Sequence, residues 1–341
     1  MQTNNHTTAK TQFSMVMTTC SIISAVLVVW IHAYNIGAYG DVSNPFVYWL
    51  EQGISQGLAR GGVPFFFMSS AFFLYSRSKP VTDIYKSRAK SIVVPYLLWN
   101  TVYMVAFAVL YRLGLTGSGM KEITVGNILG GIFLHQYNYT FWFMLYLIAY
   151  IACYPIIRWV LERGKAVAVI GLVISLALFW SQIDILERFA YYYIGALIGF
   201  YYPSAAESVV GMKKKHIVGI TSVLFVLETA LFWMTNVLGF SSMMRLRDLV
   251  MAFLLFFLVV CFNLRITGKF ASLSFVIYAL HPLLLEMIEN VLFLLLPQSA
   301  LSLLIDYVAA PVVCLVIIFA VCMLWKKVLP SVYKVFNGGR L

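Results

Sequence analysis

Charge is the scarcest property of this 341-residue sequence, because Asp, Glu, Lys and Arg make up only 11% of its residues. A soluble domain typically carries about 25% charged residues. This chain therefore has too few charges to cover a water-facing surface, and 62% of its residues are hydrophobic. The composition predicts that lipid is its solvent.

The sequence also lacks a continuous basic stripe, although its formal net charge is +11. A nucleic-acid-binding protein concentrates Lys and Arg on one face or along one helix. Here the basic residues are scattered between apolar runs. We therefore exclude nucleic acid as a partner.

Cysteine is present but lacks the spacing that its chemistry needs. The five cysteines all fall inside apolar runs, and no two of them form a CxxC pair. This pattern excludes a disulfide framework and a zinc site. We expect small buried side chains and no bound metal.

What the sequence has instead is a series of long apolar runs. A membrane-spanning helix needs about 20 mostly apolar residues, and lipid leaves the backbone no hydrogen-bond partner outside a helix or a closed barrel. We predict an all-α bundle of about ten transmembrane helices that forms a single membrane domain over residues 1–341. The predicted spans are 14–37, 57–77, 91–113, 141–161, 165–181, 187–203, 216–236, 247–265, 270–296 and 305–325.

The distribution of Lys and Arg between these runs predicts the orientation. Cytoplasmic loops carry an excess of basic residues. With the N-terminus in the cytoplasm, 18 basic residues fall on the cytoplasmic side and six on the other. We therefore expect a multi-pass protein of the cell membrane with both termini cytoplasmic.

The first external loop, residues 38–56, predicts a short helix. Ser43 or Asn44 can cap it, with Pro45 in its first turn. The apolar residues that follow would share one face, so we expect this helix to lie on the outer surface with Tyr48 and Trp49 at headgroup level.

His32 stands near the outer end of the first run, in VVWIHAYN. Desolvation favours a neutral imidazole, whose free nitrogen can take a proton from a hydroxyl group. The other interpretation is a histidine that only forms a hydrogen bond between helices. The residue alone leaves both open.

Three more polar residues lie within or beside the predicted spans and need a reason. His281 precedes Pro282, which leaves the carbonyl four residues back without its helical donor; a binding cavity and plain packing both fit. Arg60 either serves a site or extends to the headgroups. Glu228 lies in mid-span, where we expect a carboxylate to be protonated, paired or exposed to a water-filled cavity. Of these residues it is the one most suggestive of transport, although a protonated or paired carboxyl needs no transported substrate.

Five segments, in order, carry a resemblance to a known family. They are VVWIH at 28–32, RGGVPFFFMSSAFFL from Arg60, KSRAKSIVVPYLLW before and after Pro95, FWFMLYLIAYIACYPI through Trp142, and LSFVIYALHPLLL through Tyr278 and His281. Together they resemble the multi-pass acyltransferase-3 proteins, which include membrane O-acetyltransferases that act on surface polysaccharides. Ser21 and Thr18 stand where the family pattern usually has Arg and Asp.

This resemblance implies an O-acyltransferase with His32 as the catalytic base. The enzyme would move an acyl group, most simply acetyl, from acyl-CoA to a hydroxyl of a cell-envelope polysaccharide or lipid-linked glycan. Acyl-CoA would be the donor substrate, with no bound cofactor. The residues expected to bind the acceptor are Arg60, Tyr34, Asn35, Trp142, Tyr278 and His281.

The donor phosphates would meet the basic loop that holds Arg77, Lys79, Arg88 and Lys90. The alternative is that these residues only set the orientation of the chain. A second function also fits ten spans with polar interior groups: a glycan transporter or flippase, or an inactive member of the same scaffold.

Overall fold

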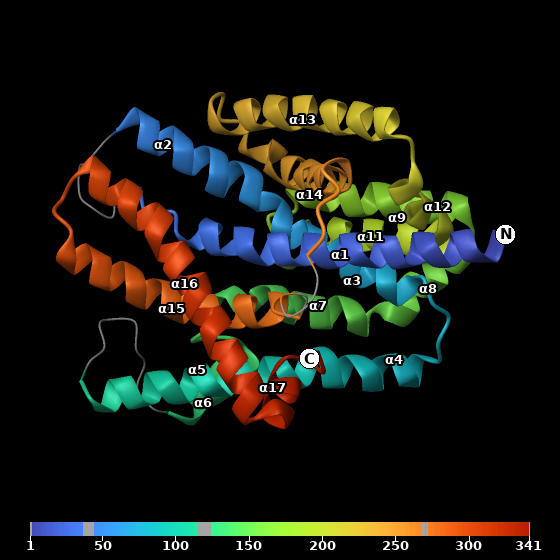
Figure 1. Ribbon diagram of the computed structural model, residues 1–341. Helices are drawn as coiled ribbons and strands as arrows, with labels where there is room; N and C mark the ends of the chain where they lie inside the picture. Colours follow the sequence, from blue (N-terminus) through green and yellow to red (C-terminus); the bar gives the residue numbers. More distant parts are fainter. Residues whose placement is uncertain (1, 37–43, 115–123, 267–269, 271, 341) are drawn as a thin grey trace. The chain divides into compact units, whose positions relative to one another are not determined.

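The structure is a computed structural model that describes residues 2–36, 44–114, 124–266, 270 and 272–340 (Figure 1). It is 85% helical, and none of the described residues forms a strand. The predicted all-α class is confirmed. The chain forms two compact units: Met1–Ser78 with Ile156–Ile317, and Lys79–Pro155 with Ile318–Leu341. A single functional domain over 1–341 stays a prediction.

Two stretches of the chain, Met1–Ser78 and Ile156–Ile317, supply the helices of the first unit. They are α1 (Gln2–His32), α2 (Pro45–Glu51), η1 (Gln52–Gly57), η2 (Leu58–Gly61), α3 (Gly62–Tyr75), most of α8 (Tyr154–Glu162), α9 (Lys165–Ala177), η5 (Leu178–Trp180), α10 (Asp184–Glu187), α11 (Phe189–Tyr201), α12 (Pro203–Ser208), η6 (Val209–Gly211), α13 (Lys214–Asn236), η7 (Ser241–Met243), α14 (Met244–Cys261), α15 (Ser274–Leu295) and the first part of α16 (Ala300–Val328).

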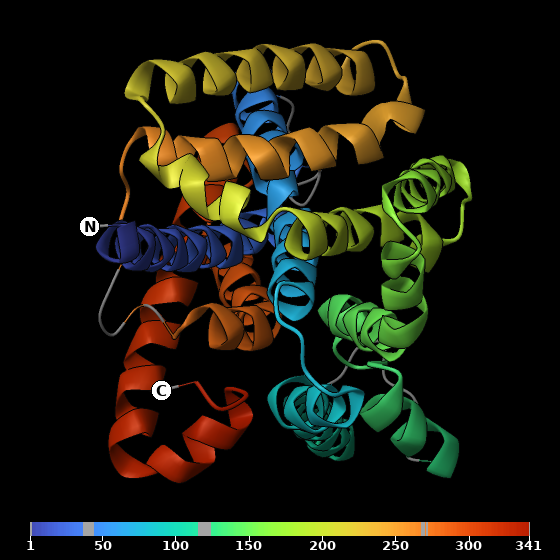
Figure 2. The ribbon, with the colours of Figure 1, turned by 90° about the vertical axis from the view of Figure 1, so that its right-hand side faces the viewer.

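Helix α1 is central to this unit, where it contacts α3, α14 and α15. Helix α13 lies along α14 (Figure 2). A core of buried apolar side chains from α1, α3 and α14 includes Phe13, Val16, Phe72 and Val259. This packing fixes α1, and with it His32, against its neighbours.

Helices α3 and α11 approach each other closely through two glycines. Gly195 and Gly199 are four residues apart, hence on one face of α11. A Cβ at Gly195 would collide with the backbone of Met68, and one at Gly199 would lie 2.5 Å from the Phe72 carbonyl oxygen. Small residues at this spacing let two membrane helices bring their backbones together.

The second unit is built around α5 (Val94–Arg112). It also holds α4 (Val81–Arg88), η3 (Ala89–Val93), α6 (Val125–Phe133), η4 (Tyr139–Phe141), α7 (Trp142–Ala152), the end of α16 and α17 (Pro330–Phe336). Trp99 on α5 donates from Nε1 to the Phe336 carbonyl (3.1 Å), and its ring contacts Trp325. Tyr96 donates to the Phe133 carbonyl (2.8 Å). These bonds tie α6 and α17 to α5.

All ten predicted spans overlap helices, but the count of ten is not confirmed. Six helical segments of the described chain are long and apolar enough to cross a membrane, or seven if Tyr139–Ala152 and Tyr154–Glu162 form one broken span. Helices such as α9 and α11 have 13 residues each, which is short for a 30 Å hydrocarbon layer at about 1.5 Å per residue. The six are Lys10–His32, Pro45–Tyr75, Val81–Arg112, Lys214–Asn236, Ser274–Leu295 and Ala300–Val328.

The expected surface helix at the first external loop is instead the first part of a continuous helical run, Pro45–Tyr75. Asn44 caps it as predicted, since its Oδ1 accepts hydrogen bonds from the backbone N–H groups of Phe46 (3.0 Å) and Val47 (3.2 Å); Ser43 lies outside the described residues. A π turn over Gln52–Gly57 and a 3-10 turn over Leu58–Gly61 connect α2 to α3, with non-helical dihedral angles at Gly57 between them.

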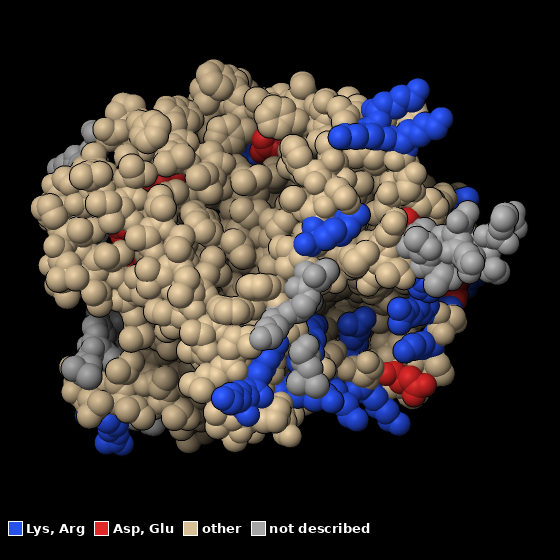
Figure 3. All heavy atoms as spheres, viewed as in Figure 1, with Lys and Arg blue, Asp and Glu red and all other residues tan. Residues whose placement is uncertain are grey.

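The surface of these helices is largely apolar. On α13, Val223 is 67% exposed and Phe225 58% exposed. Figure 3 shows mostly uncharged atoms on this face, and Lys213, Lys214 and Lys215 at the start of α13 are exposed. Such surfaces suit lipid, and together with the apolar spans they identify a membrane protein.

Candidate active site

Two histidines from distant parts of the chain meet in the first unit. His32 is the last residue of α1, and His281 lies on α15. Their ring centroids are 5.2 Å apart, with the planes tilted by 36°. The sequence predicted each histidine separately, and the contact between α1 and α15 brings them together.

The tautomer of His281 follows from its hydrogen bond. Its Nδ1 lies 3.0 Å from the Ile277 carbonyl oxygen, and a carbonyl only accepts, so Nδ1 carries the proton. In the neutral ring Nε2 is then an acceptor, and it has no hydrogen-bond partner among the described residues. His281 is completely buried, whereas His32 is half-buried. His32 is therefore the more exposed ring of the pair.

Tyr278 and Cys314 complete the surroundings of His281. The Tyr278 ring lies one turn earlier on α15, with its centroid 6.2 Å from that of His281. The Cys314 thiol of α16 lies 4.0 Å from the His281 carbonyl oxygen. Pro282 supplies no N–H, so it leaves the Tyr278 carbonyl without its helical donor. This is the local irregularity that the sequence predicted.

Asn35, three residues beyond His32, is held by two buried carboxyl groups. Its backbone N–H donates to Glu51 Oε2 (3.1 Å), and its Nδ2 donates to Asp306 Oδ2 (3.0 Å) and to the Leu303 carbonyl (3.4 Å). Glu51 is 0% exposed and Asp306 is 2% exposed. Thus the segment that follows α1, the end of α2 and α16 meet at Asn35.

Further hydrogen bonds close the same end of α1. Ser55 donates to the Trp30 carbonyl (2.6 Å), and its oxygen lies 2.8 Å from the Tyr307 hydroxyl. Gln52 donates from Nε2 to the hydroxyl oxygen of Tyr34 (2.7 Å). The predicted residues Tyr34 and Asn35 therefore both belong to a polar network beside His32.

Arg60 is part of a different network, of ion pairs. Its Nε donates to Asp248 Oδ1 (3.1 Å) and its Nη2 to Asp248 Oδ2 (3.3 Å). Arg245 lies 3.8 Å from the same carboxylate and pairs more closely with Glu187 (2.6 Å). Since its guanidinium is engaged by Asp248, binding of the acceptor by Arg60 stays a prediction.

Removal of the Asp248 carboxyl is expected to destabilise the protein more than removal of both partners. Asp248→Ala leaves Arg60 without its bidentate partner, and breaking a buried ion pair in this way costs about 3–5 kcal/mol. The double variant Arg60→Met with Asp248→Leu leaves no unpaired charge in the pair and should unfold closer to the wild type. Thermal unfolding in detergent measures both, and equal unfolding temperatures for D248A and the wild type would contradict the prediction.

The remaining predicted residues are divided between the two units. Trp142 is in the second unit, where its ring contacts Phe143 and Tyr146. Arg77 belongs to the first unit; Lys79, Arg88 and Lys90 belong to the second. Arg77, Lys79 and Lys90 are exposed and Arg88 is half-buried, so donor binding by these four stays a prediction.

Two hydroxyls occupy the places where the family pattern usually has charges. Thr18 donates to the Ser14 carbonyl (2.9 Å), and Ser21 donates to the Met17 carbonyl (2.8 Å). Both hydroxyls are therefore satisfied within α1, and neither adds a charge to the helix.

Three carboxyl groups of these networks, those of Glu51, Asp248 and Asp306, were not predicted from the sequence. Asp306 was detectable, because it interrupts the apolar run LSLLIDYVAAPVV, and an ionisable residue inside a span usually has a function or a partner. Glu51 was hidden in the segment interpreted as a surface helix. No group of three or more His, Cys, Asp or Glu among the described residues is arranged to hold a metal ion.

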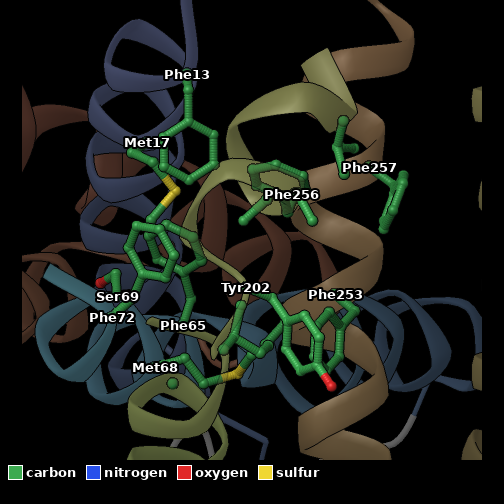
Figure 4. Close-up of a pocket in the computed structure, with 16 residues that line it drawn as sticks. Phe13, Met17, Phe65, Met68, Ser69, Phe72, Tyr202, Phe253, Phe256 and Phe257 are labelled. Carbon is green, nitrogen blue, oxygen red and sulfur yellow. The ribbon is translucent and has the colours of Figure 1, made fainter. Parts of the chain in front are cut away.

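An apolar cavity of about 320 Å³ lies elsewhere in the first unit (Figure 4). Phe13 and Met17 of α1 line it together with Phe72 of α3 and Phe256 of α14. Met17 precedes His32 by 15 residues, or about 22 Å along a helix at 1.5 Å per residue. The cavity is therefore separate from the histidine pair, and its lining does not suit a hydroxyl-rich molecule.

A family model described as an acyltransferase domain, Acyl_transf_3, matches residues 22–325. The matched segment includes both histidines, Asn35, Glu51 and Asp306. No curated protein and no solved structure matches the chain.

Proposed function

This chain belongs to that acyltransferase family, and from this premise we propose that it transfers an acyl group from acyl-CoA to a hydroxyl of a cell-envelope polysaccharide or lipid-linked glycan. The simplest acyl group is acetyl. The observation that carries the proposal is the pair of His32 and His281, a half-buried imidazole packed against a fully buried one.

In the proposed reaction His32 is the general base. It takes the proton of the acceptor hydroxyl while the hydroxyl oxygen bonds to the carbonyl carbon of the thioester. The carbon–sulfur bond then breaks, and the CoA thiolate receives the proton from the imidazolium to leave as a thiol. A positioned base of this kind contributes about 10²–10⁴-fold.

The other residues take roles that their positions allow. Tyr34, Asn35, Tyr278 and His281 lie beside or near the base and would line the acceptor site, and Arg60 and Trp142 are proposed with them from the family resemblance. Exposed Arg77, Lys79 and Lys90, with Arg88, would bind the donor phosphates. This arrangement supposes cytoplasmic termini and a protein of the cell membrane.

A glycan transporter is the second candidate, and Glu228 is the observation that favours it. This carboxyl lies in the middle of α13, and its buried Oε1 has no hydrogen-bond partner in the described part of the chain. Arg247 and Asp248 lie within electrostatic range. Their charges offer Glu228 a structural role that needs no transported substrate.

A transfer assay separates the candidates. The purified full chain in vesicles is incubated with radiolabelled acetyl-CoA and an envelope glycan, and label on the glycan is measured. We expect label on the glycan in amounts that rise with enzyme. Glycan that crosses the vesicle without CoA, with no label transferred, would contradict the enzyme and support the transporter.

A further inference from the structure

The end of α1 is held by groups that no pattern in the sequence assigned. We propose that Glu51 and Asp306 are positioning residues, which set the place of the His32 ring by holding Asn35. This inference rests on the proposed function for its meaning, but it concerns the geometry of the base and can be tested without turnover.

Helix α1 ends directly at the proposed base. His32 is the last residue of α1, and the final helical bond of this segment runs from the Ala33 N–H to the Val29 carbonyl (3.0 Å). Beyond it the chain has no helical ladder to hold it. Gln52 holds the side-chain hydroxyl of Tyr34, and Asn35 is the first residue after His32 whose backbone N–H forms a described hydrogen bond with another element.

The two carboxyl groups that hold Asn35 come from different parts of the chain. Glu51 ends α2 and receives the backbone N–H of Asn35, and Asp306 on α16 receives its side-chain amide. One bond holds the backbone and the other holds the side chain. Together they restrain both the position and the rotation of the segment that follows the base.

Loss of the hydrogen bonds between Asn35 and the two carboxyl groups would leave buried polar groups without partners. Glu51 is completely buried, and its Oε1 has no hydrogen-bond partner among the described residues, so the backbone N–H groups of Asn35 and Ile36 compensate for its desolvation. A buried polar group that loses its partner must find another or move toward water. Glu51 and Glu289 both lie within electrostatic range of Asp306, so an added negative charge would push the elements apart.

A charge-conserving swap tests the inference. Asn35→Asp places a third carboxyl between Glu51 and Asp306, and it should displace the end of α1. Asn35→Asp combined with Asp306→Asn restores the side-chain hydrogen bond with donor and acceptor exchanged and leaves the number of carboxyl groups unchanged. Since a misplacement of about 1 Å can cost about 10²-fold, we expect kcat to fall by that order in N35D and to recover largely in the double variant, with little change in the KM for acyl-CoA.

Tyr193→Phe is the matched control. It removes a buried hydrogen bond from the Tyr193 hydroxyl on α11 to the Ala168 carbonyl on α9 (3.0 Å), and neither residue belongs to the network at the end of α1. We expect Y193F to lower the unfolding temperature while kcat stays near the wild-type value. A loss of kcat in Y193F as large as in N35D would mean that general loosening explains the effect, and it would overturn the inference.

A readout without turnover keeps this inference separate from the proposed function. Diethyl pyrocarbonate modifies accessible imidazoles, and mass spectrometry gives its rate at His32 in the full chain. We expect the rate to change several-fold in N35D and to return in the swap. Unchanged His32 reactivity in N35D would overturn the positioning role, whereas absence of acyl transfer by the wild type would contradict only the proposed function.

Discussion

His32→Ala is expected to abolish detectable acyl transfer while the protein still inserts and folds. The variant removes the partly exposed imidazole of the pair, and we expect that His281 does not replace it because His281 is completely buried. Loss of a general base lowers the rate by about 10²–10⁴-fold. Transfer of label from acetyl-CoA to glycan measures the loss.

Two further variants make this result specific. His32→Gln keeps a polar side chain at the end of α1 but cannot take up a proton at neutral pH, so we expect it to be as inactive as the alanine variant. His216→Ala removes an exposed histidine near the start of α13 and should transfer at the wild-type rate. Near-wild-type product from His32→Ala would remove His32 from the mechanism.

Gly195→Ala is expected to destabilise the protein although alanine is the better helix former. Alanine gains about 1 kcal/mol over glycine inside a helix, but its Cβ would collide with the Met68 backbone, which cannot rotate away as a side chain can. Overpacking of this kind costs about 1–3 kcal/mol, occasionally more. We therefore expect a lower unfolding temperature in detergent and a lower yield of inserted protein.

Gly219→Ala on α13 is the matched control, because a Cβ at this position meets nothing within 4 Å. It should be neutral or slightly stabilising. Gly195→Leu should exceed Gly195→Ala in its effect and prevent α3 and α11 from packing. If Gly195→Ala and Gly219→Ala unfolded at the same temperature, the close contact of these helices would not be what stabilises the first unit.

The helices of this protein were predictable because apolar runs in lipid have no other stable backbone conformation. Their ends were less so. The segment from Pro45 was expected on the surface because its apolar residues would share one face, yet Glu51 and Ser55 are buried and form hydrogen bonds with Asn35 and Tyr307. These hydrogen bonds satisfy the polar side chains inside the bundle. A hydropathy pattern contains no information about such partners, and Tyr307 lies 252 residues from Ser55.

The candidate site was predictable in its members but not in its arrangement. His32 and His281 each stood out as titratable groups inside apolar runs, and the family resemblance indicated the role of His32. Their contact depends on the packing of α1 against α15, which no local pattern specifies. Asp306 carried the same signal as the histidines, an ionisable group inside a span, and its burial beside Asn35 became visible only in three dimensions.

The bond between Asn35 and Asp306 joins residues 271 positions apart in the chain. A ribosome that adds about 5–20 residues per second would release Asp306 roughly 14–54 s after Asn35. For most of that interval the nascent first helix lacks His281, and for all of it the Asn35 amide lacks its carboxylate partner Asp306. Biosynthesis therefore completes the polar network at the end of this helix late, and a chain cut short before α15 would reach the membrane without His281 and Asp306.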